Sequence, residues 1–171
     1  TQLRSISLIN AALILVGLGC LFIAIYIMRI PEPGRLDDLS SVVKSRGEKI
    51  LELRLSKSGH WREAVRLSEI DPQLIELLIA YEDKRFWKHH GVDSFAILRA
   101  VKDFLLTGRV TSGASTLTMQ TARLMRPELG KRSFFVKLHQ MMEALRIEAH
   151  WTKDEILEAY FSLAPYGGNI E

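Results

Sequence analysis

Cysteine is nearly absent from this sequence, because its 171 residues contain only one, Cys20. A single cysteine excludes an internal disulfide framework and a zinc site built from cysteine pairs. The histidines supply no alternative, since His89 and His90 are neighbours that point apart and the other three show no ligand spacing. No metal site is therefore expected from the residues themselves.

Nucleotide-binding signatures, internal repeats and low-complexity segments are also missing. Neither G-x-G-x-x-G nor G-x-x-x-x-G-K-[ST] occurs in the chain. With 171 residues, 47% of them hydrophobic, the chain can bury one core but hardly two. The formal net charge of +3 favours anionic partners, without distinguishing a phosphate, a membrane surface or a nucleic acid.

The N-terminal part contains the longest apolar run. Residues 8–28 carry no charged side chain, and as a helix they would span roughly 30 Å, the thickness of a bilayer core. The apolar region of a cleaved signal peptide is shorter. The sequence therefore predicts an uncleaved transmembrane anchor at 8–28, with residues 1–7 as its cytoplasmic flank.

A short linker follows the apolar run. Pro31 and Pro33 cannot continue a helix, so residues 29–70 are expected to contain a linker and a small β-hairpin region. Polar and apolar residues alternate after a plausible turn at Arg46 and Gly47, which is typical of a hairpin.

Helical signals dominate residues 71–171. Asp71 followed by Pro72 is a helix start, and Thr152 and Glu155 have the spacing of a capping box. Ser94 and Ser133 are expected to cap two further helices. The expected helices run from Pro72 to about residue 81, over 95–106 with Gly108 behind it, over about 116–125, over 134–150, and from Thr152 to Pro165. The fold class is therefore mostly α.

The densest chemistry lies at residues 80–91, AYEDKRFWKHHG. Glu82 stands at the end of an apolar helical segment, where desolvation can raise the pKa of a carboxylate toward the range that a general base needs. The alternative is a solvated helix end without a catalytic role.

A second polar segment, residues 113–120, reads GASTLTMQ. A glycine followed by hydroxyls at a helix start offers free N–H groups and the positive end of the helix dipole, which suits an anion or sugar phosphate. An ordinary helix cap would use the same residues. Arg123 and Lys137 would add positive charge there if their helices converge.

These segments together resemble the signatures of the peptidoglycan glycosyltransferases, glycosyltransferase family 51. The resemblance extends over about residues 68–171, in matching order and spacing, and its motifs are Glu82-Asp83-x-x-Phe86-x-x-His89-x-Gly91, Gly113-x-Ser115-Thr116-x-Thr118-x-Gln120, Lys137-x-x-Gln140 and residues 153–168. It implies a lysozyme-like, mostly helical domain behind a single N-terminal membrane helix. It also implies that residues 1–171 stop inside the last signature, so that this stretch alone would be inactive.

The resemblance implies an enzyme that polymerises lipid II into glycan strands at the outer, periplasmic face of the bacterial cytoplasmic membrane. Glu82 would be the base for the acceptor hydroxyl, and Arg123 and Lys137 would neutralise the departing pyrophosphate. A divalent cation, Mg²⁺ or Mn²⁺, and other cell-wall synthesis proteins are further partners that the resemblance allows. The remaining substrate-binding positions that it implies are Asp83, His89, Ser115, Thr116, Gln120 and Gln140.

Four positions depart from the family pattern. Arg123 stands where a lysine is frequent, and Val136 stands where an arginine is usual. Met119 stands where a glutamine is usual, and Gln140 stands where a second glutamate is usual. Gln140 cannot transfer a proton, but a pyrophosphate leaving group needs charge neutralisation more than protonation, unlike the alkoxide of a glycosidase. Two alternatives stay open: a lytic glycosidase of the same fold, and a catalytically silent membrane-tethered module that binds cell-wall precursor or partners.

Overall fold

The computed structural model describes residues 2–108, 113–131, 133–167 and 170, and for residues 2–9 and 11 it describes the backbone alone. Within these residues the chain is mostly helical with one two-stranded sheet, so the expected mostly α class is confirmed. The α-helices and strands are α1 (Gln2–Met28), β1 (Ser41–Lys44), β2 (Ile50–Arg54), α2 (Pro72–Glu82), α3 (Ser94–Thr107), α4 (Leu117–Met125), α5 (Phe134–His150) and α6 (Lys153–Leu163). Short 3₁₀ turns occur at Gly34–Asp37, Leu67–Glu69, Phe86–Lys88 and Pro127–Gly130.

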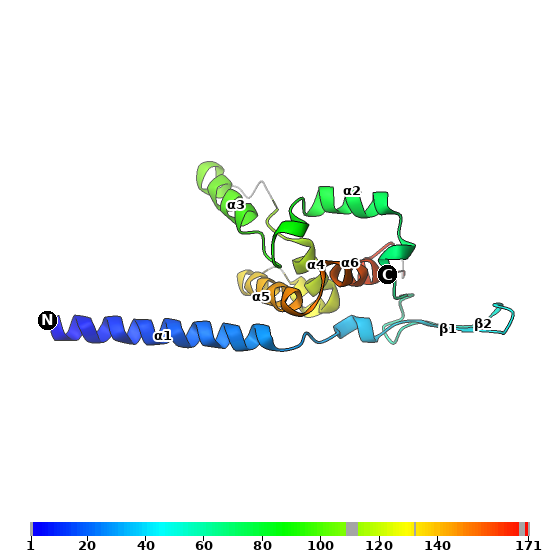
Figure 1. Cartoon of the computed structure of the whole chain (residues 1–171), viewed down its shortest axis with the longest axis horizontal. Helices are drawn as coiled ribbons and strands as arrows, with labels where there is room; N and C mark the ends of the chain where they lie inside the picture. Colours follow the sequence, from blue (N-terminus) through cyan, green and yellow to red (C-terminus); the bar gives the residue numbers. More distant parts are fainter. Residues whose placement is uncertain (1, 109–112, 132, 168–169, 171) are drawn as a thin grey trace.

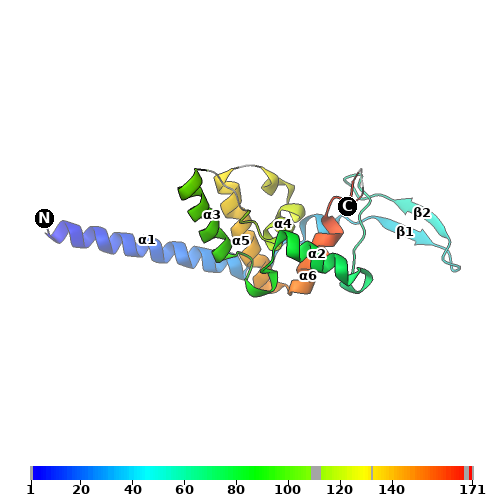
Figure 2. The same ribbon diagram turned by 90° about the horizontal axis from the view of Figure 1, so that it is seen from above.

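Helix α1 extends away from the other helices (Figures 1 and 2). Its large apolar side chains are exposed, for example Leu15 at 69% and Phe22 at 66%. Among the residues whose side chains are described, no helix has the length and hydropathy needed to cross a membrane. The anchor expected at 8–28 includes positions 8, 9 and 11, whose side chains lie outside that part, so the anchor stays a prediction.

The expected β-hairpin is present at the end of the molecule opposite α1 (Figures 1 and 2). β1 and β2 pair antiparallel, with Ser41 opposite Arg54. The chain returning from the hairpin is fixed by Arg62, which is fully buried and whose guanidinium donates to the carbonyls of Asp38 at 2.5 Å and Arg35 at 3.2 Å.

The hydrophobic core lies where α4 packs against both α5 and α6. Phe86, which follows α2 closely in the chain, is fully buried in this core. Its burial fixes the residues after α2 against the helix pair, because a buried aromatic ring leaves its backbone little freedom. The fully or almost fully buried members of the core cluster are Phe86, Leu117, Ala122, Met125, Leu129, Ile147, Ile156, Leu157, Phe161 and Leu163.

Side-chain caps explain where two of the helices begin. Asp71 accepts a hydrogen bond from the N–H of Gln73, and Pro72 occupies the first turn of α2, as predicted. Thr152 and Glu155 form the predicted capping box at the start of α6.

Two predicted caps were wrong in detail. The cap of α3 is Asp93 rather than Ser94, because Ser94 is already helical and the Asp93 carboxylate accepts the N–H groups of Phe95 and Ala96. Ser133 occupies the cap position of α5, but its side chain makes no capping hydrogen bond. Gly108 closes α3 in the left-handed conformation, with φ of 68°, as predicted.

Candidate active site

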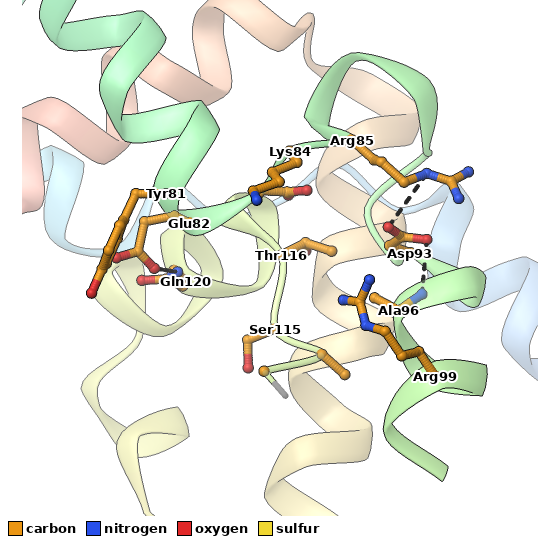
Figure 3. A pocket seen from close by; sticks show the side chains of 13 residues that line it. Tyr81, Glu82, Lys84, Arg85, Asp93, Ala96, Arg99, Ser115, Thr116 and Gln120 are labelled. Atoms are coloured by element: carbon orange, nitrogen blue, oxygen red, sulfur yellow. Dashed lines mark hydrogen bonds and ion pairs between the residues drawn. The ribbon is translucent and has the colours of Figure 1, made fainter. Parts of the chain in front are cut away.

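Two cavities meet at the end of α2. The larger, about 450 Å³, lies between the end of α2, the first turns of α3 and the 113–116 segment (Figure 3). The smaller, about 240 Å³, lies between α4 and α5 and reaches the same helix end. Glu82, Ser115 and Gln120 line both cavities, so Glu82 stands where they meet.

Glu82 is the last residue of α2, and its carboxylate accepts a hydrogen bond from Nε2 of Gln120 at 2.8 Å. The expected desolvation of Glu82 was wrong, because its side chain is exposed. Helix α2, all of which is described, has no buried residue and lies at the outside of the helical body. The structure therefore orients this carboxylate through Gln120 but does not remove it from water.

Asp83, the next residue, is buried and makes contacts inside the protein. One carboxylate oxygen accepts the N–H of Leu117, the first residue of α4, at 2.9 Å. The same carboxylate accepts from Nε2 of His89, at 2.9 Å and 3.1 Å from its two oxygens. Both residues were predicted to bind substrate, and the structure brings them together at the start of α4.

Thr116 connects the two predicted motifs from the other side. Its hydroxyl donates to the carbonyl of Gly91 at 2.6 Å and accepts the N–H of Met119 at 3.1 Å, so Thr116 is also the cap of α4. Gly91 has φ of +88°, and a Cβ there would lie 2.6 Å from the carbonyl oxygen of Ala144. Only glycine allows this segment to pack so closely on α5.

Lys137 connects the predicted residues of the smaller cavity. Its ammonium donates to Oγ of Ser115 at 2.5 Å and to Oε1 of Gln140 at 3.2 Å. Gln140 is buried and donates from Nε2 to the carbonyl of Leu129 at 2.5 Å. Burial and, secondly, the charge of nearby Arg123 lower the pKa of Lys137. The two cations that the sequence placed on neighbouring helices thus converge on one cavity.

Lys153 supports the segment after α2 from the core side. Its ammonium donates to the carbonyl of His89 at 2.8 Å and to Glu148 at 2.6 Å, and it lies 4.3 Å from the centre of the Phe86 ring. Glu148 also accepts the hydroxyl of Thr118 at 2.6 Å. This ion pair joins α4, α5 and α6 to the chain that carries Asp83 and His89.

The sequence did not predict the cations of the larger cavity, Lys84, Arg85 and Arg99. Arg85 stands 3.6 Å from the Asp93 carboxylate, and Arg99 extends from α3 toward the middle of the cavity (Figure 3). Lys84 and Arg85 belong to the charged cluster that the sequence shows. Arg99 could not be predicted, because the α3 sequence alone does not show which side of α3 faces the cavity.

Tyr160, on α6, was also missed. Burial and, to a smaller extent, the negative charge of Glu82 raise the pKa of the Tyr160 phenol. The phenol is therefore a protonated hydrogen-bond donor close to the site at neutral pH. The sequence feature that could have identified Tyr160 is its position in the helix of the last signature.

Carboxylates of the site are mostly committed to protein partners. Asp83 binds His89 and Leu117, and Asp93 caps α3 and lies beside Arg85. Among the residues that the structure describes, no group of three or more His, Cys, Asp or Glu side chains could hold a metal ion. Glu82 is therefore the carboxylate with the most freedom to act on a bound molecule.

Comparisons with known proteins agree with the sequence resemblance. Residues 46–171 match a family model described as Transglycosylase. The chain is 46% identical to penicillin-binding protein 1C of Escherichia coli over 113 residues. These residues make up 66% of this chain and 14% of that protein. It is 44% identical to penicillin-binding protein 1A of the same organism over 103 residues, and these residues make up 59% of this chain and 12% of that protein.

A shorter relative matches over more of its length. The biosynthetic peptidoglycan transglycosylase of Rhodospirillum centenum is 34% identical over 165 residues, which cover 93% of this chain and 64% of that protein. The chain thus spans about an eighth of the length of the two longer relatives, by the 14% and 12% above.

The lowered pKa of Lys137 predicts how anion binding depends on pH. A phosphate in the smaller cavity stabilises the charged ammonium, so binding requires a proton on Lys137. We expect the affinity for inorganic pyrophosphate to fall as pH rises through the lowered pKa, below the ordinary value of 10.5. Calorimetric titration across this range should show the fall, and Lys137→Met should remove it. Equal affinity at neutral pH and just below pH 10.5 would contradict the coupling.

Proposed function

The chain belongs to the transglycosylase family, and from this premise we propose that it is part of a peptidoglycan glycosyltransferase. The proposed reaction joins lipid II units into glycan strands, inverts the anomeric carbon and releases polyprenyl pyrophosphate. The observation that carries the proposal is the position of Glu82 between two cavities, one of which holds Arg123 and Lys137.

Glu82 is proposed as the general base. Its carboxylate takes the proton of the acceptor sugar hydroxyl while that oxygen forms a bond to the anomeric carbon of the donor. The hydrogen bond from Gln120 at 2.8 Å fixes the direction of the carboxylate, and a fixed direction is what proximity catalysis requires. Because Glu82 is exposed, we expect bound sugars to displace the water around it.

The smaller cavity is proposed to hold the donor pyrophosphate. As the bond between the anomeric carbon and the phosphate oxygen breaks, negative charge grows on the leaving group. Lys137 and Arg123 neutralise it, and Ser115 holds the Lys137 ammonium in place at 2.5 Å. Gln140 supplies no proton, but its amide, fixed between Lys137 and the Leu129 carbonyl, keeps the ammonium turned toward the cavity.

The larger cavity is proposed to hold the acceptor. An acceptor lipid II keeps its own pyrophosphate during the reaction, so a second set of cations is needed at a distance from the first. Lys84, Arg85 and Arg99 line this cavity and supply that charge. Ser115 lines this cavity, and its half-buried hydroxyl can contact a sugar. The Thr116 hydroxyl is buried and bonded to Gly91 and Met119, so Thr116 is proposed to shape the cavity wall.

Residues 8–28 are proposed as the single membrane anchor, with the helical domain, proposed to be lysozyme-like, at the outer face of the bacterial cytoplasmic membrane. Three observations support this: the run lacks charge, α1 is continuous to Met28, and the large apolar side chains described from Leu13 to Ile25 are exposed. A polyprenyl-linked substrate would lie in the same membrane. Partnership with other cell-wall synthesis proteins is proposed on the family resemblance alone.

A catalytically silent module that binds cell-wall precursor is the second candidate. It is favoured by Gln140, which stands at the usual acid position and is bonded to Lys137 and to the backbone. Such a module would keep its affinity for lipid II and show no turnover.

Glu82→Gln separates the two candidates. The change keeps the shape of the side chain but removes its basicity, so polymerisation of lipid II by the full-length protein should fall at least about 100-fold while lipid II binding is kept. Glu76→Gln is the matched control, because Glu76 is exposed on the same helix and outside both cavities. Turnover near the wild-type value in Glu82→Gln would refute the base assignment, and no turnover in the wild type would favour the binding module.

Arg99→Ala tests the acceptor cavity. Losing one charge-assisted contact to a retained phosphate should raise the KM for lipid II about 10-fold, with a smaller effect on kcat, since the phosphate does not react. Lys102→Ala is the control, because Lys102 is exposed on α3 outside the cavity. An unchanged KM, or a loss confined to kcat, would remove Arg99 from the acceptor site.

A further inference from the structure

A buried group of charges lies away from the active site, where the end of α1 contacts α5. We call Tyr26, Arg126, His139, Glu143 and Arg146 the Glu143 cluster. Glu143 is 2% exposed, and its carboxylate accepts a short hydrogen bond from the Tyr26 hydroxyl. Nε of Arg146 lies 3.2 Å from this carboxylate, and Nη1 of Arg126 lies 3.6 Å from it.

Tyr26 contacts two further members of the cluster. Its hydroxyl lies 3.1 Å from Nε2 of His139, and the centre of its ring lies 5.1 Å from the guanidinium carbon of Arg146. The ring therefore covers a buried guanidinium, an arrangement stabilised by the cation–π attraction. One aromatic side chain of α1 thus contacts both buried charges: its hydroxyl bonds to Glu143, and its ring lies over the Arg146 guanidinium, whose Nε and Nη2 have no hydrogen-bond partner among the described residues.

Two more contacts attach the chain that follows Tyr26. Nε2 of His150, at the end of α5, lies 3.2 Å from the carbonyl oxygen of Met28. Arg126 donates from Nη2 to Glu32 at 2.7 Å. The end of α1 and the residues after it are therefore connected to α5, and to the end of α4, at several points.

Burial makes this contact selective for one geometry. Removing a partner from a carboxylate and a guanidinium that are buried together leaves an uncompensated buried charge, which is costly. If the end of α1 moved away, Glu143 would lose the Tyr26 hydroxyl and Arg146 would lose its aromatic cover. The cluster therefore favours a single orientation of α1 relative to α5.

Helix α5 also carries the active-site cation. Lys137 precedes Glu143 by six residues on the same helix, which corresponds to roughly 9 Å along its axis. An orientation fixed at Glu143 is therefore transmitted to Lys137 through two turns of regular helix. The end of α1 and Lys137 are thus connected through α5.

We propose that the Glu143 cluster holds the active site at a fixed depth above the membrane surface, and that Tyr26, Glu143 and Arg146 are positioning residues for a membrane-bound substrate. This inference rests on the proposed function, because a lipid-linked pyrophosphate lies at a defined depth in the interface. If the helical domain changed its orientation relative to α1, the active site would bind the pyrophosphate in the correct geometry only part of the time.

The first test compares two substrates of the full-length protein: long-chain lipid II in bilayers and a short-chain, water-soluble lipid II analogue. Tyr26→Ala should lower the rate about 10-fold with bilayer substrate and leave the rate with the soluble analogue nearly unchanged. Tyr26→Phe, which keeps the ring, should have a smaller effect of the same kind. Phe22→Ala is the control, since Phe22 lies one turn earlier on α1 and is 66% exposed.

Equal losses with both substrates would show that the cluster only supports the fold, and no loss with either would show that it does not position the site. Both results overturn the proposal. Glu143→Gln provides a second variant with the same expected pattern, and its thermal unfolding temperature identifies a loss caused by misfolding.

The second test does not depend on activity. Spin labels on the exposed native Cys20 and on an Asp154→Cys variant at the start of α6 report the distance between the anchor and the helical body. We expect a narrow distance distribution in the wild type and a broad one in Tyr26→Ala. A broad wild-type distribution would overturn the inference. The wild-type protein could also show a narrow distribution that broadens in Tyr26→Ala, but no activity on either substrate. That result would support the fixed orientation of α1 relative to α5 and refute the proposed function.

Discussion

The carboxylate of Asp83 is the contact on which the site depends. It accepts the first N–H of α4 and binds His89, so it joins the end of α2 to the start of α4. The helix dipole and the buried hydrogen bonds both favour a carboxylate there. Because Glu82 precedes Asp83 directly, fixing Asp83 inside the protein leaves Glu82 at the junction of the two cavities. One buried acid therefore positions the exposed one.

Positive charge is divided between the two sides of Glu82. Arg123 and Lys137 lie in the smaller cavity, and Lys84, Arg85 and Arg99 lie in the larger. The proposed reaction between two lipid pyrophosphates needs this division, since one pyrophosphate would leave and the other would stay. In the smaller cavity, burial and, secondly, the charge of Arg123 lower the pKa of Lys137, so the charged form of Lys137 carries an electrostatic cost. Negative charge that develops on the leaving group offsets this cost, which links the electrostatics of the cavity to the proposed chemistry.

Much of the fold could be predicted because its signals are local. Asp71 with Pro72, the capping box at Thr152 and the glycine after α3 each act within a few residues. The exposure of Glu82 could not be predicted, since it depends on what covers α2, and no residue of α2 is fully buried. The role of Arg99 and the contact of Tyr26 with Glu143 depend on how distant helices face each other, which no local pattern encodes.

In the proposed reaction, neutralisation by cations, and not a proton from α5, drives the departure of the pyrophosphate. The most direct test is the single-turnover rate on lipid II of Gln140→Glu and Lys137→Ala, with Lys131→Ala as a control outside both cavities. A carboxylate at the position of the Gln140 oxygen, 3.2 Å from the Lys137 ammonium, would cancel part of the positive field. The account predicts no gain or a slower reaction in Gln140→Glu, and a loss on the order of 10²–10³ in Lys137→Ala. A many-fold acceleration in Gln140→Glu would contradict it.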